Sequence, residues 1–400
     1  MPDSVYGLRD RDLLALAVLV LLALGLLMVQ SAAFIAEPQA GPALLDWSGR
    51  GVKHALYVAL AMLAFVTASR LDVGKLARST ASGSPAVWFA GIAVILAVLV
   101  LIPGVGAEVN GARRWLRLGP LNVQPSELVK WGVVLLVAWR LSRPGPFELG
   151  RGFLTLSAFV GVMCLLVVIH DFGSAALIAA TAGVMFLAGP VKLRWLAAAV
   201  LPAAGAAFWF VWSEPYRMRR ISAFLDPWAN PESDGYHVIQ SLYSFAGGGW
   251  TGRGLGNGVQ KLGYLPEDTT DFIFAVVCEE LGLFGALLVA GSYLIVITAG
   301  WCVSRRCPDP FCRLLAFGVV AALGLQATIN IAVATASLPT KGIALPLVSA
   351  GGTGLVCTGF MLGLVYAVGR GPVEARDGDW ERLLRGNHAR ADSAADEDED

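Results

Sequence analysis

Charged side chains are scarce in this sequence. Of its 400 residues, 15% are Asp, Glu, Lys or Arg, whereas 56% are hydrophobic and the mean hydropathy is +0.65. Soluble domains carry more charge, and this composition is typical of membrane proteins. Acidic and basic residues balance at 30 each, and we expect no nucleic-acid partner. The composition predicts a polytopic membrane protein.

Patterns for disulfides, zinc and a cleaved leader are also missing. Three of the six cysteines lie in apolar runs, and the others, Cys302, Cys307 and Cys312, surround one short loop with no fourth ligand nearby. Structural zinc takes four ligands, so we expect free thiols and no metal site of this kind. The first apolar run is long and lacks a small-residue cleavage site, which predicts a retained helix.

Ten apolar runs reach or approach the length of about 20 residues that spans a bilayer. They lie near residues 13–34, 54–69, 86–103, 125–142, 153–169, 173–189, 194–212, 271–302, 313–336 and 350–369. They predict an all-α domain, residues 1–370, with ten transmembrane helices. Lys and Arg concentrate in the segments that a cytoplasmic N-terminus would place inside. The positive-inside rule therefore predicts a multi-pass protein of the cytoplasmic membrane with both termini in the cytoplasm.

The loop between the seventh and eighth runs, residues 213–270, is too long for a simple connection and is predicted to be structured and extracytoplasmic. Its stretch 236–245 has the spacing of an amphipathic interfacial helix. The glycine-rich stretch 246–260 predicts a shaped loop, because glycine allows close backbone approach. The acidic end, residues 371–400, is too poor in apolar residues to fold and is predicted to be a disordered cytoplasmic tail.

Several cations lie on the side where the topology disfavours them. Residues 104–124 carry Arg113, Arg114 and Arg117, and residues 213–270 carry Arg217, Arg219, Arg220, Arg253 and Lys261. Together they indicate an anionic ligand on the outer face. For any single arginine, snorkelling of the side chain to the membrane interface is the simpler interpretation.

Carboxylates lie near the same face. The stretch YLPEDTTDFIFAVVCEELG at 264–282 puts Asp271 at the mouth of an apolar run. A carboxylate inside a membrane helix is costly and is therefore a candidate functional residue. Asp271 could also cap the helix, as could Asp171 in IHDFGSA. Glu127 and Lys130, one turn apart, could line the site or form a structural ion pair.

Two further features belong to this region. Glu279 and Glu280 would repel if both were ionised, so at least one should be neutral or hydrogen-bonded, and Glu280 is predicted to lock the bundle. The Pro- and Gly-rich stretch 337–356 interrupts the last two spans, which membranes tolerate only where backbone is buried or lines a cavity. Its Lys341 either faces a phosphate or reaches the interface. These features predict an anion-binding cleft with carboxylates, open to the outer leaflet.

The chain resembles the SEDS family (shape, elongation, division and sporulation) of peptidoglycan glycosyltransferases. The resemblance lies in NGARRWLRLGPLNVQPSELVK, RMRRISAFLDPW, GYHVIQSL, GLGNGVQKLGYLPEDTTDFIFAVVCEELG and LPTKGIALPLVSAGGTG, which run in family order from about residue 110 to 355. The loop motifs are more similar to the division branch, FtsW, than to the elongation branch, RodA. This chain departs from the family pattern at Ile169-His170, within Asp268-Thr269-Thr270-Asp271 and within Ser349-Ala350-Gly351-Gly352-Thr353.

The resemblance implies that the chain polymerises lipid II, a disaccharide-pentapeptide on undecaprenyl pyrophosphate, with inversion at the sugar. The family's carboxylate maps onto Asp271, which would be the general base. The residues that would bind substrate are Arg113, Arg114, Glu127, Lys130, Asp171, Arg219, Arg220, Lys261, Lys341 and Ser349. The lipid tail needs a groove between spans. Small residues in the sixth, seventh, ninth and tenth runs would allow one, or simply close packing.

The resemblance also implies partners: a class B penicillin-binding protein as transpeptidase, other division proteins and membrane lipids. A divalent cation, Mg²⁺ or Mn²⁺, between Asp271 and the phosphates is compatible with the chemistry, but no dedicated ligand set is visible. Three alternatives stay open. The chain could be a lipid II flippase, since transporters also use intramembrane charge and broken helices. It could be an elongation polymerase like RodA, or an assembly scaffold.

Overall fold

The computed structural model describes residues 9–36, 49–78, 83–109, 112–118, 121–143 and 150–371. The predicted acidic tail lies outside these residues except for Gly371. The described chain is mostly helical, and the prediction of a polytopic membrane protein is confirmed at that level. Among the described residues, six helices are long and apolar enough to cross a membrane, and three further apolar helices are shorter.

Each of the ten predicted runs coincides with a helix. The helices are α1 (Asp10–Ala36), α2 (Arg50–Ser69), α4 (Pro85–Leu101), α5 (Pro125–Leu141), α6 (Arg151–Val168), α7 (Phe172–Ala188), α8 (Leu193–Trp212), α11 (Ile273–Arg306), α12 (Pro310–Ala334) and the C-terminal helix Thr353–Gly371. A shorter helix, α3 (Val73–Arg78), follows α2. Pro occupies the first turn of α4, α5 and α12, where its missing N–H costs nothing.

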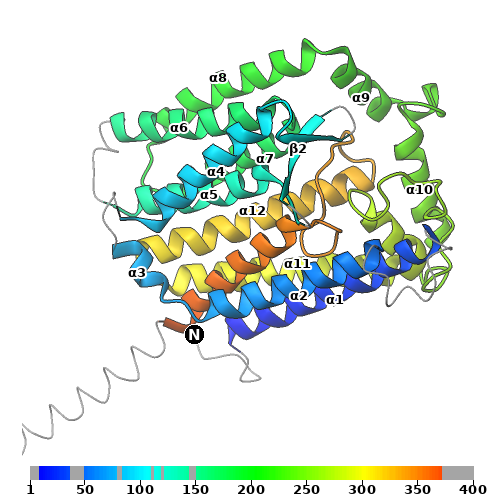
Figure 1. The fold of residues 1–400 in the computed structure, drawn as a ribbon, viewed down its shortest axis with the longest axis horizontal. Helices are drawn as coiled ribbons and strands as arrows, with labels where there is room; N and C mark the ends of the chain where they lie inside the picture. Colours follow the sequence, from blue (N-terminus) through cyan, green and yellow to red (C-terminus); the bar gives the residue numbers. More distant parts are fainter. Residues whose placement is uncertain are drawn as a thin grey trace, which may run out of the picture.

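The long helices lie side by side in one bundle (Figure 1). α12 runs through its middle, between α1, α2 and α11 on one side and α4 to α7 on the other. α8 lies at the edge, and only Leu196 of its 20 residues is buried. The guanidinium of Arg11, at the start of α1, lies 5.7 Å from the ring of Tyr366 in the C-terminal helix. Both described ends of the chain therefore lie at the same end of the bundle.

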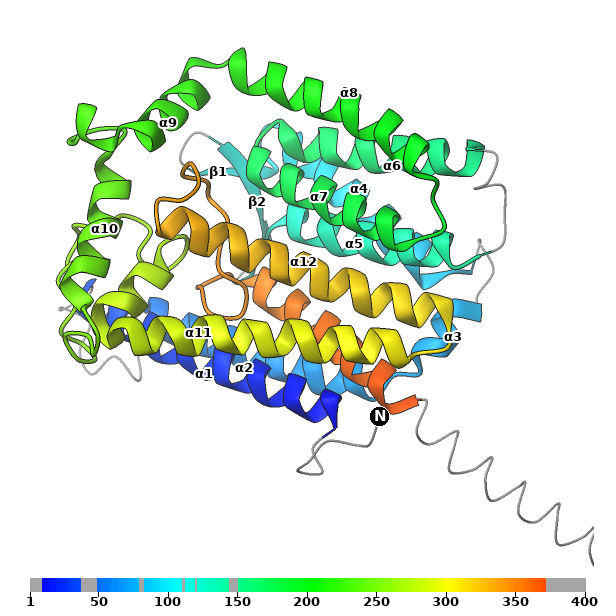
Figure 2. The same ribbon diagram turned by 180° about the vertical axis from the view of Figure 1, so that it is seen from behind.

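The opposite end is formed by the segment between α8 and α11 (Figure 2). It contains α9 (Pro215–Leu225), the 3₁₀ turn η1 (Pro227–Ala229) and α10 (Tyr236–Gly248). The helix predicted over 236–245 is confirmed by α10, which packs on α11. The long loop is therefore folded in its described form, as predicted.

A small sheet is the exception to the predicted all-α class. β1 (Gly106–Val109), β2 (Ala112–Leu118) and β3 (Leu121–Val123) form an antiparallel sheet in the order β1-β2-β3. The all-α prediction is wrong for these residues. In β2, successive side chains point to opposite faces of the sheet, and this two-residue period fits a strand and not a helix. Leu116 is buried, and Arg113 pairs with Glu108 at the opposite position of β1, with 3.4 Å between Nε and Oε2.

α11 is broken at Gly282, whose backbone has φ 64° and ψ −156°. The left-handed φ is one that glycine adopts without strain. At 34 residues, α11 is longer than the roughly 20 residues that a bilayer requires. The break divides it into a short half, from Ile273 to Leu281, and a long half that continues to Arg306.

Candidate functional site

Asp271 lies in the turn that precedes α11. Its neighbour Phe272 is the N-cap and makes no side-chain cap hydrogen bond, so the Asp271 carboxylate does not cap the helix. The turn closes on Glu267, whose carbonyl accepts from the N–H of Phe272 at 3.1 Å and whose φ is 56°. A positive φ is uncommon outside glycine and marks a constrained turn. The chain is thus bent sharply where it presents Asp271.

The segment 337–352 lies directly against this carboxylate. A Cβ placed on Gly342 would be 3.2 Å from Oδ2 of Asp271 and 3.7 Å from Nη1 of Arg114. Arg114 comes from β2 and donates its Nε–H to the carbonyl of His170 at 2.8 Å. The sheet, the turn between α6 and α7 and the 337–352 segment therefore meet at Asp271.

Two more cations reach the same region from other elements. Arg220 on α9 donates from Nη1 to the carbonyl of Thr340 at 3.3 Å and also bonds the hydroxyl of Tyr216. Lys341 places its amino group 4.9 Å from the ring centre of Phe172 at the start of α7. Burial lowers the pKa of Lys341 from its usual value. The structure brings Arg114 and Arg220 close to the Asp271 carboxylate, and Lys341 is next in sequence to Gly342, which lies against that carboxylate.

The electrostatics of Asp271 reflect its confinement. Burial, and next the charges of Glu267 and Asp171, raise its pKa from 3.8 to about 7, against the opposite effects of Arg114 and Arg220. Within the described part of the chain, no side chain donates a hydrogen bond to this carboxylate. A carboxyl group that titrates near neutrality and has no donor of its own can accept a proton from a ligand.

A groove opens beside Arg114. Its polar part is formed by Arg113, Arg114, Ser126, His170 and Asp171, and its apolar part by Ala97, Val100, Leu101, Pro125, Leu166 and Val167. It lies between α4 and α6, the third and fifth predicted spans. The sequence had indicated another position for a groove, among the sixth, seventh, ninth and tenth apolar runs, whose small residues would leave room for one. Asp171 lines the groove and caps α7, accepting from the N–H of Ser174 at 3.0 Å.

Buried amides of α12 connect Asp271 to the ion pair of α5. Asn330 donates from Nδ2 to the carbonyls of Asp271 and Ile343, both at 2.8 Å. One turn earlier, Gln326 donates to the carbonyl of Ala344 at 2.8 Å and accepts from Lys130 Nζ at 2.7 Å. Lys130 also contacts Glu127 at 2.6 Å and is 3% exposed. This pair therefore supports the site from inside the bundle.

The side chains of three residues that were predicted to bind substrate make other contacts within the protein. Lys261 has a fully buried side chain that pairs with Glu280, so its amino group is not available to a ligand. Ser349 bonds two backbone groups, the N–H of Leu345 and the carbonyl of Thr270. Arg219 is largely exposed and pairs with Asp234 at 3.6 Å. The structure does not bring these three into the Asp271 cluster, because each already serves a local contact.

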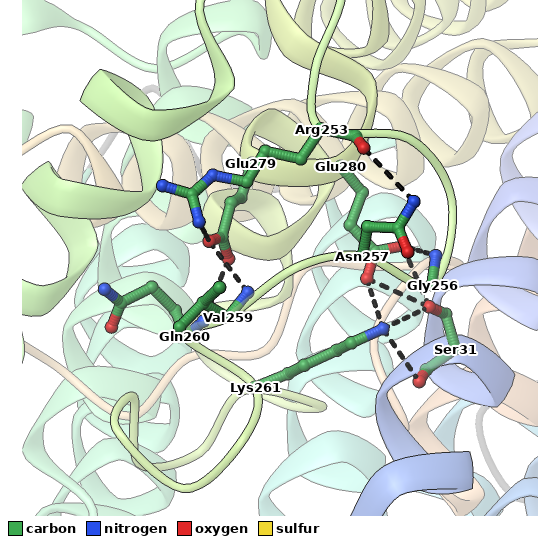
Figure 3. A network of polar contacts seen from close by, with 9 residues as sticks. All are labelled: Ser31, Arg253, Gly256, Asn257, Val259, Gln260, Lys261, Glu279 and Glu280. Atoms are coloured by element: carbon green, nitrogen blue, oxygen red, sulfur yellow. Dashed lines mark hydrogen bonds and ion pairs between the residues drawn. The ribbon is translucent and has the colours of Figure 1, made fainter.

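Glu279 and Glu280 are both hydrogen-bonded, as predicted for at least one (Figure 3). Glu279 accepts from the N–H groups of Val259 at 2.9 Å and Gln260 at 3.1 Å. Glu280 accepts from Ser31 Oγ at 2.8 Å and from the N–H of Gly256 at 3.0 Å. The glycine-rich loop is thus shaped by these contacts. The two glutamates hold structure and do not face the groove.

Sequence reasoning missed Asn330, Gln326, Glu267 and Gly342. A signal existed for the amides, because Gln326 and Asn330 are buried polar residues one turn apart in an apolar helix, which is expensive without a role. No local pattern indicates Glu267 or Gly342, whose importance follows from packing. Among the described residues, no group of three or more His, Cys, Asp or Glu could hold a metal ion.

Comparison with known proteins gives consistent matches. The family model FTSW_RODA_SPOVE, described as cell cycle protein, matches residues 11–372. The probable peptidoglycan glycosyltransferase FtsW of Alkalilimnicola ehrlichii is 40% identical over 363 residues, which cover 89% of this chain and 88% of that protein. The protein of the same name from Nitrosococcus halophilus is 40% identical over 360 residues, 88% of this chain and 90% of its own.

Solved structures agree. A chain from a study of how a peptidoglycan synthase complex coordinates polymerization and crosslinking superposes with a TM-score of 0.70 at 29% identity, covering 89% of this chain and 96% of that one. The rod shape determining protein RodA of Thermus thermophilus superposes with a TM-score of 0.63 at 26% identity, covering 89% and 95%.

Proposed function

Because this chain belongs to the FTSW_RODA_SPOVE family of cell cycle proteins, we propose that it is a peptidoglycan glycosyltransferase of the FtsW kind, which polymerises lipid II in cell division. The observation that carries the mechanism is Asp271, a confined carboxylate whose pKa is raised to about 7, next to Arg114. We infer one inverting displacement, in which the 4-hydroxyl of one sugar attacks the anomeric carbon of another and the lipid diphosphate leaves.

Asp271 is the general base of this step. It takes the proton of the attacking hydroxyl as the new glycosidic bond forms and the bond to the diphosphate breaks. A base is most effective when its pKa lies near the working pH, and burial together with Glu267 and Asp171 brings Asp271 there. One carboxylate suffices, because diphosphate leaves readily once its charge is stabilised, whereas glycosidases need a second acid.

The nearby cations stabilise the leaving group. Arg114 reaches the site from β2, Arg220 from α9 and Lys341 from the segment against Asp271. Guanidinium groups make charge-assisted and often bidentate bonds to phosphate oxygens. We assign the diphosphate to this triangle of cations, with Arg113 at the rim of the groove. The apolar part of the groove, between α4 and α6, would contact the lipid next to the diphosphate.

The topology that fits this chemistry has ten spans in residues 1–370, with both termini in the cytoplasm and residues 213–270 outside the cytoplasmic membrane. Its support is the single bundle, with α9 and α10 at the end opposite the described termini (Figure 1). A class B penicillin-binding protein is the proposed partner, because one similar chain comes from a synthase complex that links polymerization with crosslinking. Division proteins and lipid II complete the set of partners, and residues 371–400 form a cytoplasmic tail.

The test uses the purified full chain in detergent with labelled lipid II, with and without a class B penicillin-binding protein. Formation of glycan strands is the expected result. Exchange of lipid II between the leaflets of liposomes without strand formation would instead identify a flippase. If neither occurs even with the transpeptidase present, the proposed activity is wrong and a scaffold role remains.

A further inference from the structure

The glycine-rich loop, residues 246–260, supplies hydrogen-bond partners for the backbone groups at the break in α11. An unbroken helix would bond the N–H groups of residues 283 and 284 to the carbonyls of 279 and 280. Here Leu283 donates to the carbonyl of Gly249 at 3.0 Å and Phe284 to that of Trp250 at 3.4 Å. In an apolar medium, freed backbone groups need such partners. The loop therefore replaces the missing turn.

The freed carbonyls are also used. The N–H of Arg253 donates to the carbonyl of Glu279 at 2.9 Å, and that of Gly254 to Glu280 at 3.0 Å. The fit is close, since a Cβ on Gly252 would be 2.1 Å from the carbonyl oxygen of Glu280 and one on Gly248 would be 1.9 Å from that of Cys278. The end of α10, the loop and the short half of α11 thus form one unit, which carries Asp271.

Side chains fasten this unit to the rest of the bundle. Lys261 Nζ lies 2.5 Å from Glu280 Oε1, and both side chains are 0% exposed. Lys261 also donates to Ser31 Oγ at 2.8 Å and to the Ser31 carbonyl at 3.2 Å, while the Ser31 hydroxyl donates to Glu280. Ser31 belongs to α1, so this group of three residues ties α1 to the unit (Figure 3).

Stability alone does not explain a buried ion pair, because well-packed apolar residues are often equally stable. What a pair adds is a defined geometry. From Gly282 to Asp271 the chain covers eleven residues, about 16 Å if helical, so a rotation of roughly 10° at Gly282 would move the carboxylate by about 3 Å. Misplacement by 1 Å can cost on the order of a hundredfold in rate.

We propose that Ser31, Lys261 and Glu280 form a latch that positions Asp271 by fixing the short half of α11 against α1. The three are positioning residues and do not touch the substrate. The inference rests on the proposed function for its catalytic consequence. Its structural consequence, slow amide exchange around the break at Gly282, does not depend on the proposed function.

The test variant is the double substitution Lys261→Met/Glu280→Gln, which keeps side-chain size and the acceptor for Ser31 and Gly256 but removes both charges. The matched control is Asp10→Asn/Arg306→Gln, which removes the ion pair at the other end of the same helix. Two quantities are measured on each folded protein: kcat and KM for lipid II, and hydrogen exchange at the amides of Arg253, Gly254, Leu283 and Phe284.

The latch variant is expected to lose kcat by about 10- to 100-fold with KM changed less than about twofold, and its four amides should exchange at least about tenfold faster. The control should change neither. Wild-type kcat in the latch variant, or unchanged amide exchange, would overturn the proposal. So would a rise in KM that accounts for the loss of activity.

If the double variant does not fold, Ser31→Ala decides by the same criteria with smaller changes. The outcome for the latch is separate from that for the proposed function. A wild-type chain that makes no glycan from lipid II would refute the function, whereas the exchange rates would still show whether the latch holds the break.

Discussion

Asp271 and Glu280 are carboxylates nine positions apart, the first half-buried and the second fully buried, and their surroundings are opposite. Glu280 is matched by an ammonium group, a hydroxyl and a backbone N–H. Asp271 has two arginines nearby but, among the described residues, no side chain that donates to its oxygens. The difference teaches that burial alone does not mark a reactive carboxylate. The satisfied group holds the structure, and the group left without donors is available for a proton.

The largest expected effect comes from removing the unsatisfied carboxylate. Asp271→Asn should lower lipid II polymerisation by about 10²- to 10⁴-fold, because the amide cannot accept the hydroxyl proton. Glycan synthesis by the purified variant measures this effect. The matched control is Asp268→Asn, three residues earlier in the same turn, which should stay within a few-fold of wild type. Retained polymerisation in Asp271→Asn would defeat the assignment.

The satisfied carboxylate should respond in stability. Lys261→Met leaves Glu280 buried without its counter-charge, which costs about 3–5 kcal/mol in comparable pairs. Thermal unfolding in detergent measures the loss. Arg306→Met, which removes a pair with a 63% exposed arginine, should cost about 1 kcal/mol or less. Equal losses in the two variants would remove the distinction between a latch and an ordinary ion pair.

The pH dependence sharpens the comparison further. Because the folded-state pKa of Asp271 is raised to about 7, polymerisation should increase with pH through about 7 as the base loses its proton. For the same reason Asp271 contributes stability below about pH 4 that is lost as pH rises to 7. Asp271→Asn should therefore match wild type in stability at pH 4 and exceed it at pH 8, by at most about 4 kcal/mol. If the difference in melting temperature between Asp271→Asn and wild type were the same at pH 4 and pH 8, this prediction would be contradicted.

A smaller effect is expected at the amide that holds the backbone of Asp271. Asn330→Ala removes two buried hydrogen bonds, to the carbonyls of Asp271 and Ile343, and should cost about 1–3 kcal/mol. Gln326→Ala is the matched change one turn away, on the side of Lys130. If Asn330 positions the base, its variant should lose more kcat than the Gln326 variant at similar stability. Similar activities would argue against this role.

The sequence predicted what depends on local pattern. Apolar runs gave the helices, and glycine content gave a shaped loop. The sheet was missed because the arginines of β2 obscure the alternation that buries Leu116. The break at Gly282 was invisible because apolar residues continue across it.

The site divides in the same way. Residue type and resemblance to a family predicted Asp271, Arg114 and Arg220 for the candidate site, and the structure places these three close together. Lys261 was assigned to substrate because its partners, Glu280 and Ser31, lie 19 and 230 positions away in the chain, and neither contact leaves a local signal. Charges whose partners are distant look unpaired in a sequence, which explains why a structural lysine was counted as a ligand.

Gly342 carries one more consequence. A methyl group there would stand 3.2 Å from the oxygen of Asp271 that faces the 337–352 segment. The clearance in front of the proposed base is therefore set by a residue without a side chain. A mutational screen limited to charged residues would not include this position. Alanine and then valine at Gly342 would progressively reduce the space available to a sugar hydroxyl, and every titratable group would stay in place.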